Sequence, residues 1–353
     1  MIEIDGSRLS GSGTIVRDAA SLCILCKERL RITNIRAKRP KPGLRPQHLK
    51  ALEAAAQLCG GELTGAFAGS KEITLAPGSV LNGGAYEWNI GSAGSAVMLA
   101  LTILPLALFA DGPSRYRITG GLFQDFAPSA FHFLHVLLPA LRKMGLDLSA
   151  VIVRPGYVPK GQGVLEIRAA PAKRNQTPLD LADPGAVTRI DGIALSSHLS
   201  EKKVSKRMAE ACRTVLATRG YAPRIDVLYD DKDTPVYRLG AVQPGAALAI
   251  WAETDTGCRI GSDMAGARGR SSEFIGRQTA ACLLEDLDAR ASVDRHLADQ
   301  LIPFTALIEG ESVFRIPAVT EHVEVRLWLV EKILGAKTAV EAGIVRIQGR
   351  RPR

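Results

Sequence analysis

Apolar residues recur at helical spacing in paired segments that follow loops containing glycine or serine. The predicted helices of the first two pairs cover residues 14–25 and 47–59, then 96–109 and 130–144. Gly60 and Gly145 end the second helix of each pair, and glycine is common at a helix C-terminus. Short apolar or alternating runs between turn residues predict strands at residues 30–35, 62–64, 72–75, 116–119, 150–153 and 164–167.

Two agreeing offsets indicate that this pattern is repeated. The tripeptide Arg31-Ile-Thr recurs at Arg117, 86 positions later, and Gly60 and Gly145 are 85 positions apart. A fixed period of this kind is typical of a duplicated structural unit. A third copy is predicted near the C-terminus, with helices at 297–308 and 321–334 and strands at 313–316 and 344–348.

Residues 186–287 break the repeat. Their pattern predicts strands at 189–195, 224–229 and 246–253, and helices at 200–219 and 272–286. We therefore predict an α+β fold in which three repeated β-α-β-type units, each with two helices and a small sheet, occupy residues 1–185 and 288–353. A smaller α+β domain at 186–287 is inserted before the third unit, and residues 171–184 are the predicted linker into it.

Composition places the chain among soluble globular proteins. It has 353 residues, of which 46% are hydrophobic and 23% charged. The most apolar stretch, residues 93–110, contains Gly94, Ser95, Thr102 and Pro105, so we expect a buried helix and no membrane span. The start of the chain lacks the pattern of a signal peptide, and the six scattered cysteines suit a reducing compartment, so we expect a cytoplasmic protein.

Positive charge is concentrated near the N-terminus. The net charge is +9, and residues 27–50 contain nine Lys or Arg and one acidic residue. Prolines within residues 36–45 prevent a helix there, so the charges are not a helical solvated face. A stiff basic loop predicts a binding site for a polyanion.

Other features leave two interpretations open. The loops 11–13 and 91–95 could hold an anion at a helix N-terminus or could simply begin a helix. The glycine-rich residues 156–163 fit a hairpin connection. His132 and His135, three positions apart on one helix, have metal-ligand spacing, but no acidic or cysteine residue lies nearby in sequence, which favours histidines on the surface or in a groove.

His322 is the predicted catalytic residue. It begins a helix, where backbone amides could receive phosphate oxygens, and its loop corresponds in the repeat to the basic loop. Imidazole, with an ordinary pKa of roughly 6.5, is a competent nucleophile at neutral pH. Spacing alone does not distinguish this role from that of a structural histidine.

The sequence resembles the RNA 3′-terminal phosphate cyclase family over nearly its whole length. The resemblance is carried by ordered motifs: Ile35-Arg-Ala-Lys-Arg-Pro-Lys-Pro-Gly-Leu44 with Gln47-His-Leu49, Ile90-Gly-Ser-Ala-Gly-Ser95, Phe109-Ala-Asp-Gly-Pro-Ser114, Gly156-Tyr-Val-Pro-Lys-Gly161, Gly266-Ala-Arg-Gly-Arg270, Leu297-Ala-Asp-Gln-Leu301 and Val319-Thr-Glu-His322. The resemblance implies the same fold that the repeated pattern predicts. It also implies a ligase-type nucleotidyl transfer, in which ATP drives conversion of an RNA 3′-phosphate to a 2′,3′-cyclic phosphate.

The resemblance also implies roles for individual residues. His322 would attack the α-phosphorus of ATP and carry AMP. Nucleotide-binding residues would be His296, Leu297, Ala298, Asp299, Gln300 and Pro128. Phosphate- or RNA-binding residues would be Arg17, Arg36, Arg39, Lys41 and Gln47. A divalent metal, Mg²⁺ or Mn²⁺, is expected to assist, with ligands that the sequence does not identify.

Departures from the family pattern keep a second function open. Ser10 stands where the family usually has a glutamate, and Leu101 where it has a nucleotide-contacting glutamine. His296 replaces an aromatic residue, and Gly120-Gly-Leu-Phe123 replaces Gly-Gly-Thr-Asp. The alternative is a catalytically inactive cyclase-like protein that binds RNA or assists assembly. A third interpretation, an enolpyruvyl transferase, rests on fold analogy alone.

Overall fold

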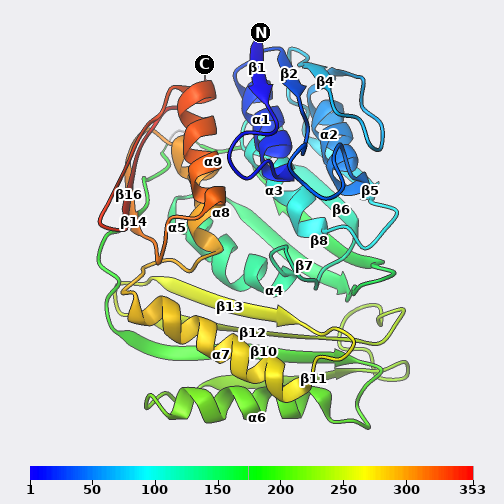
Figure 1. The fold of residues 1–353 in the computed structure, drawn as a ribbon, viewed down its shortest axis with the longest axis vertical. Helices are drawn as coiled ribbons and strands as arrows, with labels where there is room; N and C mark the ends of the chain where they lie inside the picture. The colour runs from blue at the N-terminus through cyan, green and yellow to red at the C-terminus, as the bar shows by residue number, and fades with distance from the viewer. Residues whose placement is uncertain (174, 353) are drawn as a thin grey trace.

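Three four-stranded sheets in the computed structural model share one strand order (Figure 1). The structure describes residues 1–173 and 175–352. Counted along the chain, the first and second strands of each sheet pair in parallel. The fourth strand lies between the second and the third and is antiparallel to both. In spatial order the strands are β1 (Ile2–Asp5), β2 (Leu30–Thr33), β4 (Ile73–Ala76) and β3 (Glu62–Thr64); β5 (Gly84–Asn89), β6 (Ser114–Gly120), β8 (Gly163–Ala169) and β7 (Leu148–Arg154); and β9 (Asp180–Leu181), β14 (Gly310–Arg315), β16 (Ile344–Gly349) and β15 (Lys337–Glu341).

Each of these sheets is accompanied by two helical segments. They are α1 (Gly13–Leu25) and α2 (Pro46–Cys59); α3 (Ala96–Ala107) and the continuous run α4 (Ala130–His132), η1 (Phe133–Leu137) and α5 (Leu138–Lys143); and α8 (Leu297–Ala306) and the run α9 (Glu321–Leu329) and η2 (Val330–Leu334). The apolar stretch predicted to be a buried helix forms α3, which packs against α1, α2 and α8. Within the described ranges, no helix has the length and apolar character needed to cross a bilayer.

The fourth sheet belongs to the segment predicted as an insertion. Its order is β11 (Arg224–Asp230), β10 (Val187–Ser197), β12 (Gly245–Thr254) and β13 (Arg259–Ala265), and helices α6 (Val204–Ala217) and α7 (Ser272–Asp288) pack together against it. β12 is a nearly continuous apolar run, the pattern of a strand buried on both faces. The Trp251 ring stacks on His135 of η1 with centroids 4.3 Å apart, so this sheet packs against the second unit.

The main correction to the predicted layout concerns the linker at residues 171–184. Arg174, within it, lies outside the described residues, but Asp180 and Leu181 form β9 and pair with β14. The third sheet therefore begins before the fourth sheet does in the chain. A two-residue strand has too few positions to produce an alternating pattern, and β13 and β15 were likewise not predicted.

Tyr157, from the glycine-rich loop at 156–163, anchors the second unit to the fourth sheet. Its buried hydroxyl lies 2.9 Å from Ser197 Oγ, which donates to Asp230 Oδ2 at 2.9 Å. Gln243 Nε2 donates to the Tyr157 carbonyl at 2.8 Å. A Cβ at Gly245 would lie 2.1 Å from Tyr157 Cγ, so only glycine fits there. The loop is thus more than a hairpin connection.

We predict that Gly245→Ala destabilises the protein by about 2 kcal/mol, because the added methyl group overpacks the Tyr157 ring. Urea unfolding followed by tryptophan fluorescence measures the change. Gly112→Ala is the matched control, since no atom would lie within 4 Å of its Cβ. Equal unfolding midpoints for the two variants would contradict the anchoring role of Tyr157.

Candidate active site

The N-termini of α1 and α9 lie next to each other. Thr14 Oγ1, in the first turn of α1, lies 3.3 Å from His322 Nδ1, in the first turn of α9. Ser12 caps α1 by accepting from the Thr14 amide, and Thr320 caps α9 by accepting from the Val323 amide. Two helix N-termini directed at one point favour an anion there.

The start of α1 depends on a glycine. A Cβ at Gly13 would lie 2.1 Å from Nε2 of His48, whose buried ring packs against this turn. Burial, together with Arg17, Arg36 and Arg45, lowers the pKa of His48 to about 2, so its ring is neutral. His48 Nδ1 accepts from the Arg45 amide at 3.3 Å and fixes the start of α2 beside α1.

A cavity of about 430 Å³ opens beside His322. All three units and the fourth sheet contribute to its walls, which include Thr14 of α1, Met98 and Leu101 of α3, residues 123–129, Ala247 and Leu248 of β12, residues 263–265 of β13, and His296, Asp299 and Gln300 of α8. This volume suits a ligand the size of a single small molecule, since such pockets measure roughly 300–1,000 Å³.

Arg326 forms a buried ion-pair bridge below the cavity. It is 3% exposed; its Nε donates to Asp18 Oδ2 of α1 at 2.7 Å, and one terminal nitrogen donates to Asp299 Oδ2 of α8 at 2.7 Å. Arg17, equally buried, lies beside it and donates to Thr14 Oγ1 at 3.5 Å. Burial lowers the pKa of Arg17 to about 10, which leaves it charged at neutral pH.

The surroundings of His322 keep its imidazole neutral. Partial removal from water lowers the pKa of His322, and Arg326, Arg17 and Arg39 lower it further, while Asp299 opposes them. The ring remains exposed at the cavity, and Nδ1 faces Thr14. An imidazole whose pKa lies below its ordinary value is unprotonated at neutral pH, which a nitrogen nucleophile requires.

His132 occupies a different environment from the surface or groove that its sequence neighbours suggested. It is buried, and its Nε2 donates to Asp294 at 3.0 Å, across 162 residues of sequence. Asp294 also accepts from the amides of His296, Leu297 and Gly261 at 2.8–2.9 Å. The pair therefore fixes the start of α8. His135, stacked on Trp251, does not join it.

The pKa values of this pair shift in opposite directions. Burial alone would lower the pKa of His132, but the Asp294 carboxylate outweighs burial and raises it. Burial alone would raise the pKa of Asp294, but His132 and the donated amides outweigh burial and lower it. Both shifts favour the charged form of the pair over the neutral form.

The predicted nucleotide-binding residues divide by helix face. His296, Asp299, Gln300 and Pro128 line the cavity. The side chains of Leu297 and Ala298 are buried in the core on the opposite side of α8, because consecutive helical residues point in different directions. Gln300 is 2% exposed, and its Oε1 has no hydrogen-bond partner among the described residues. This acceptor fits a donor on a ligand.

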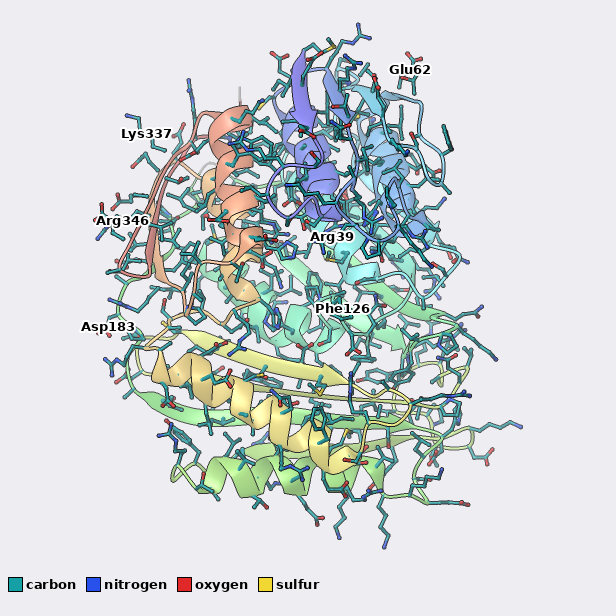
Figure 2. All side chains as sticks on the ribbon, in the orientation of Figure 1. Arg39, Glu62, Phe126, Asp183, Lys337 and Arg346 are labelled. Atoms are coloured by element: carbon teal, nitrogen blue, oxygen red, sulfur yellow. The ribbon has the colours of Figure 1, made fainter. Side chains whose placement is uncertain are left out.

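The predicted phosphate-binding residues also divide. Arg36 donates to the carbonyls of Lys41 and Gly43 and so braces the basic loop, and Gln47 Oε1 accepts from the Ser95 amide at 3.1 Å. Those two side chains support loops. Lys41 is exposed, and Arg39 is half-buried with no side-chain hydrogen bond or ion pair within the described ranges. Figure 2 shows Arg39 between the upper helices and the fourth sheet.

The two departures from the family pattern have different surroundings. Leu101 lines the cavity, while Ser10 is buried outside it and accepts from the Ser12 amide at 3.2 Å. Across residues 1–173 and 175–352, no group of three His, Cys, Asp or Glu could hold a metal ion.

Several residues of the cavity were not predicted from the sequence. Thr14 followed a recognised glycine loop and could have been included. Arg326 and Asp263 gave no local signal: Asp263, on β13, accepts from the Ser129 amide at 3.1 Å and so holds the start of α4. Phe126 lines the cavity with its side chain fully exposed and its backbone at φ +61°, a costly conformation for a bulky residue of order 1–3 kcal/mol.

Comparisons with known proteins identify relatives over nearly the whole chain. A family profile described as RNA 3′-terminal phosphate cyclase matches residues 8–340. The chain is 37% identical to the RNA 3′-terminal phosphate cyclase of Methanopyrus kandleri, covering 95% of this chain and 93% of that protein. It is 37% identical to the protein of that name from Pyrococcus abyssi, covering 95% and 94%.

A solved structure, the enolpyruvyl transferase NikO from Streptomyces tendae, aligns with 100% of this chain at 12% identity and a TM-score of 0.37. This chain spans 49% of that one. At this score the likeness supports no argument about fold or function.

We predict that Asp294→Asn lowers the free energy of unfolding by about 3 kcal/mol near pH 6, because it removes one partner of a buried ion pair. The raised pKa of His132 means that the stabilisation is complete below its unfolded pKa of about 6.5 and is lost as pH rises through the folded value. The difference between wild type and variant should therefore narrow at alkaline pH.

Urea unfolding at several pH values measures this difference. Asp233→Asn, an exposed position, is the control. A difference that stays constant from pH 6 to pH 9 would show that the pair does not titrate as described.

Proposed function

Because this chain belongs to the RNA 3′-terminal phosphate cyclase family, we propose that it uses ATP to convert an RNA 3′-terminal phosphate to a 2′,3′-cyclic phosphate, through AMP bound to His322. The observation that carries the proposal is the position of the neutral His322 ring, at a helix N-terminus beside a cavity of one-nucleotide size.

In the first step, His322 Nε2 attacks the α-phosphorus of ATP. A P–N bond forms, the bond to the bridging oxygen of pyrophosphate breaks, and the electron pair leaves with pyrophosphate. We propose that Nδ1–H donates to Thr14 Oγ1 across their 3.3 Å contact, which leaves the Nε2 lone pair free for the attack. The buried Arg17 and Arg326 and the two helix N-termini supply positive potential for charge that develops on the phosphate oxygens.

In the second step, an oxygen of the RNA 3′-phosphate attacks the phosphorus of the bound AMP. The P–N bond breaks, and His322 is restored. In the third step, the neighbouring 2′-hydroxyl attacks the 3′-phosphorus, its proton passes to solvent, and AMP leaves. Each step is transfer at phosphorus, for which positioning and charge neutralisation are the main catalytic contributions.

Other residues are proposed to bind the nucleotide. The unpartnered Gln300 Oε1 suits a donor such as an exocyclic amine, and Asp299, His296 and Pro128 line the same space. With Ser10 in place of the family glutamate and no protein-built metal cage in the described chain, we assign no step to a metal. The division into a repeated-unit domain at 1–185 and 288–353 and an inserted domain at 186–287, and a cytoplasmic location, belong to the same proposal.

We predict that the wild type, incubated with ATP labelled at the α-phosphate and Mg²⁺ or Mn²⁺, forms an acid-labile, alkali-stable protein adduct. His322→Ala should form none, because the attacking nitrogen is gone. His198→Ala, in the fourth-sheet segment and outside the cavity, is the control and should label as wild type does.

If the wild type forms no adduct but still binds RNA, that result would contradict the proposal. It would favour the alternative, a cyclase-like RNA-binding or assembly factor, to which Ser10 and Leu101 point.

We also predict that Arg39→Ala weakens binding of a 3′-phosphorylated oligoribonucleotide and reduces the slope of log K against log salt by about 0.7, as expected when one contact to single-stranded phosphate is lost. Lys337→Ala removes an equal charge from an exposed position on β15, away from the cavity, and serves as the control (Figure 2). The same slope for wild type and Arg39→Ala would refute the contact.

A further inference from the structure

Phe126 stands at the cavity with its ring in solvent. Several large apolar side chains are exposed among the described residues, including Phe67, Phe274 and Val319. Of these exposed apolar residues, only Phe126 lines the cavity. Its neighbour Phe123 is buried.

The loop carrying Phe126 is fixed on both sides. Asp125 forms a two-pronged ion pair with Arg270, with both N–O distances at 2.9 Å, and Arg270 also donates to the Ala265 carbonyl of β13. Three residues after Phe126, the Ser129 amide donates to Asp263, and the Ser129 side chain caps α4. The exposure and left-handed backbone of Phe126 are therefore built into the fold. Strained residues of this kind cluster at ligand sites.

The substrate determines what such a ring could meet. A cavity of about 430 Å³ takes one small molecule, so the rest of an RNA chain must pass over the rim. Proteins recognise single-stranded RNA ends by stacking unpaired bases on aromatic rings beside cationic groups that contact the phosphates. Arg39 supplies such a cation, and Figure 2 shows both residues between the upper helices and the fourth sheet.

We propose that Phe126 is the platform on which the RNA base next to the reacting 3′-phosphate stacks. The assignment rests on the proposed function, because it takes a single-stranded RNA end as the substrate. Phe126 would select for an unpaired end and hold the terminal ribose so that its phosphate faces His322. A base paired in a duplex could not lay its face on the ring.

The experiment uses an oligoribonucleotide with a 3′-phosphate and 2-aminopurine as its last base, whose fluorescence falls on stacking. We expect quenching on binding to the wild type. Phe126→Ala and Phe126→Leu should each lose the quenching and bind about tenfold more weakly, and Phe126→Tyr should restore both. Leucine keeps apolar bulk without a ring, so it separates stacking from simple burial.

Two controls make the outcomes distinct. Phe67→Ala, at an exposed phenylalanine that does not line the cavity, should quench like the wild type. Equal quenching and affinity in wild type and Phe126→Ala would overturn the proposal. So would a larger loss of ATP affinity than of RNA affinity, since that assigns the ring to adenine. Failure of the wild type to form the AMP adduct, with quenching retained, would refute the catalytic proposal and leave the stacking site standing.

Discussion

The geometry of the site depends on one buried charge cluster, in which Arg326 bridges Asp18 and Asp299. Asp18 belongs to α1, Asp299 to α8 and Arg326 to α9, so three helices from the two ends of the chain are joined at one point. Leaving one member of such a cluster unpaired costs roughly 3–5 kcal/mol, which discourages sliding of one helix past another. The facing N-termini of α1 and α9, and hence the contact between Thr14 and His322, follow from this constraint.

In the proposed reaction, the surroundings of His322 must meet two opposed chemical needs. A histidine nucleophile must be unprotonated, whereas the phosphates that it attacks require positive charge nearby. Removal from water lowers the pKa of His322 most, and the field of Arg326, Arg17 and Arg39, which would also attract phosphate, lowers it further. Asp299 partly offsets that field, and its pairing with Arg326 limits the offset. Burial and this charge arrangement together explain how an imidazole can stay neutral beside two helix N-termini.

Sequence patterns predicted the helices and most strands because periodicity is local. Residues 47–59 closely match α2, and Gly60 ends it in the left-handed conformation. A candidate residue of the site could be predicted from the sequence only where it belongs to a recognised motif, as His322 does. The ion pair between Asp18 and Arg326 could not be predicted, because the two residues are 308 positions apart and periodicity carries no information about pairing. His132 shows the limit most clearly: the lack of acidic or cysteine residues nearby in sequence favoured a histidine on the surface or in a groove, and its actual partner, Asp294, comes from another part of the chain.

The fourth sheet completes the site that the three similar sheets begin. β12 and β13 form one wall of the cavity, and β13 contributes Asp263, which holds the start of α4, and the Gly261 amide, which donates to Asp294 at the start of α8. Both contacts orient helices that carry cavity residues. The sheet is therefore part of the frame of the cavity, and the Tyr157 anchor matters because displacement of the sheet would disturb both helix starts together. This dependence explains why β13 was not predicted from the sequence pattern. Polar residues of β13 contact other units, so they do not alternate with apolar residues as in a half-buried strand.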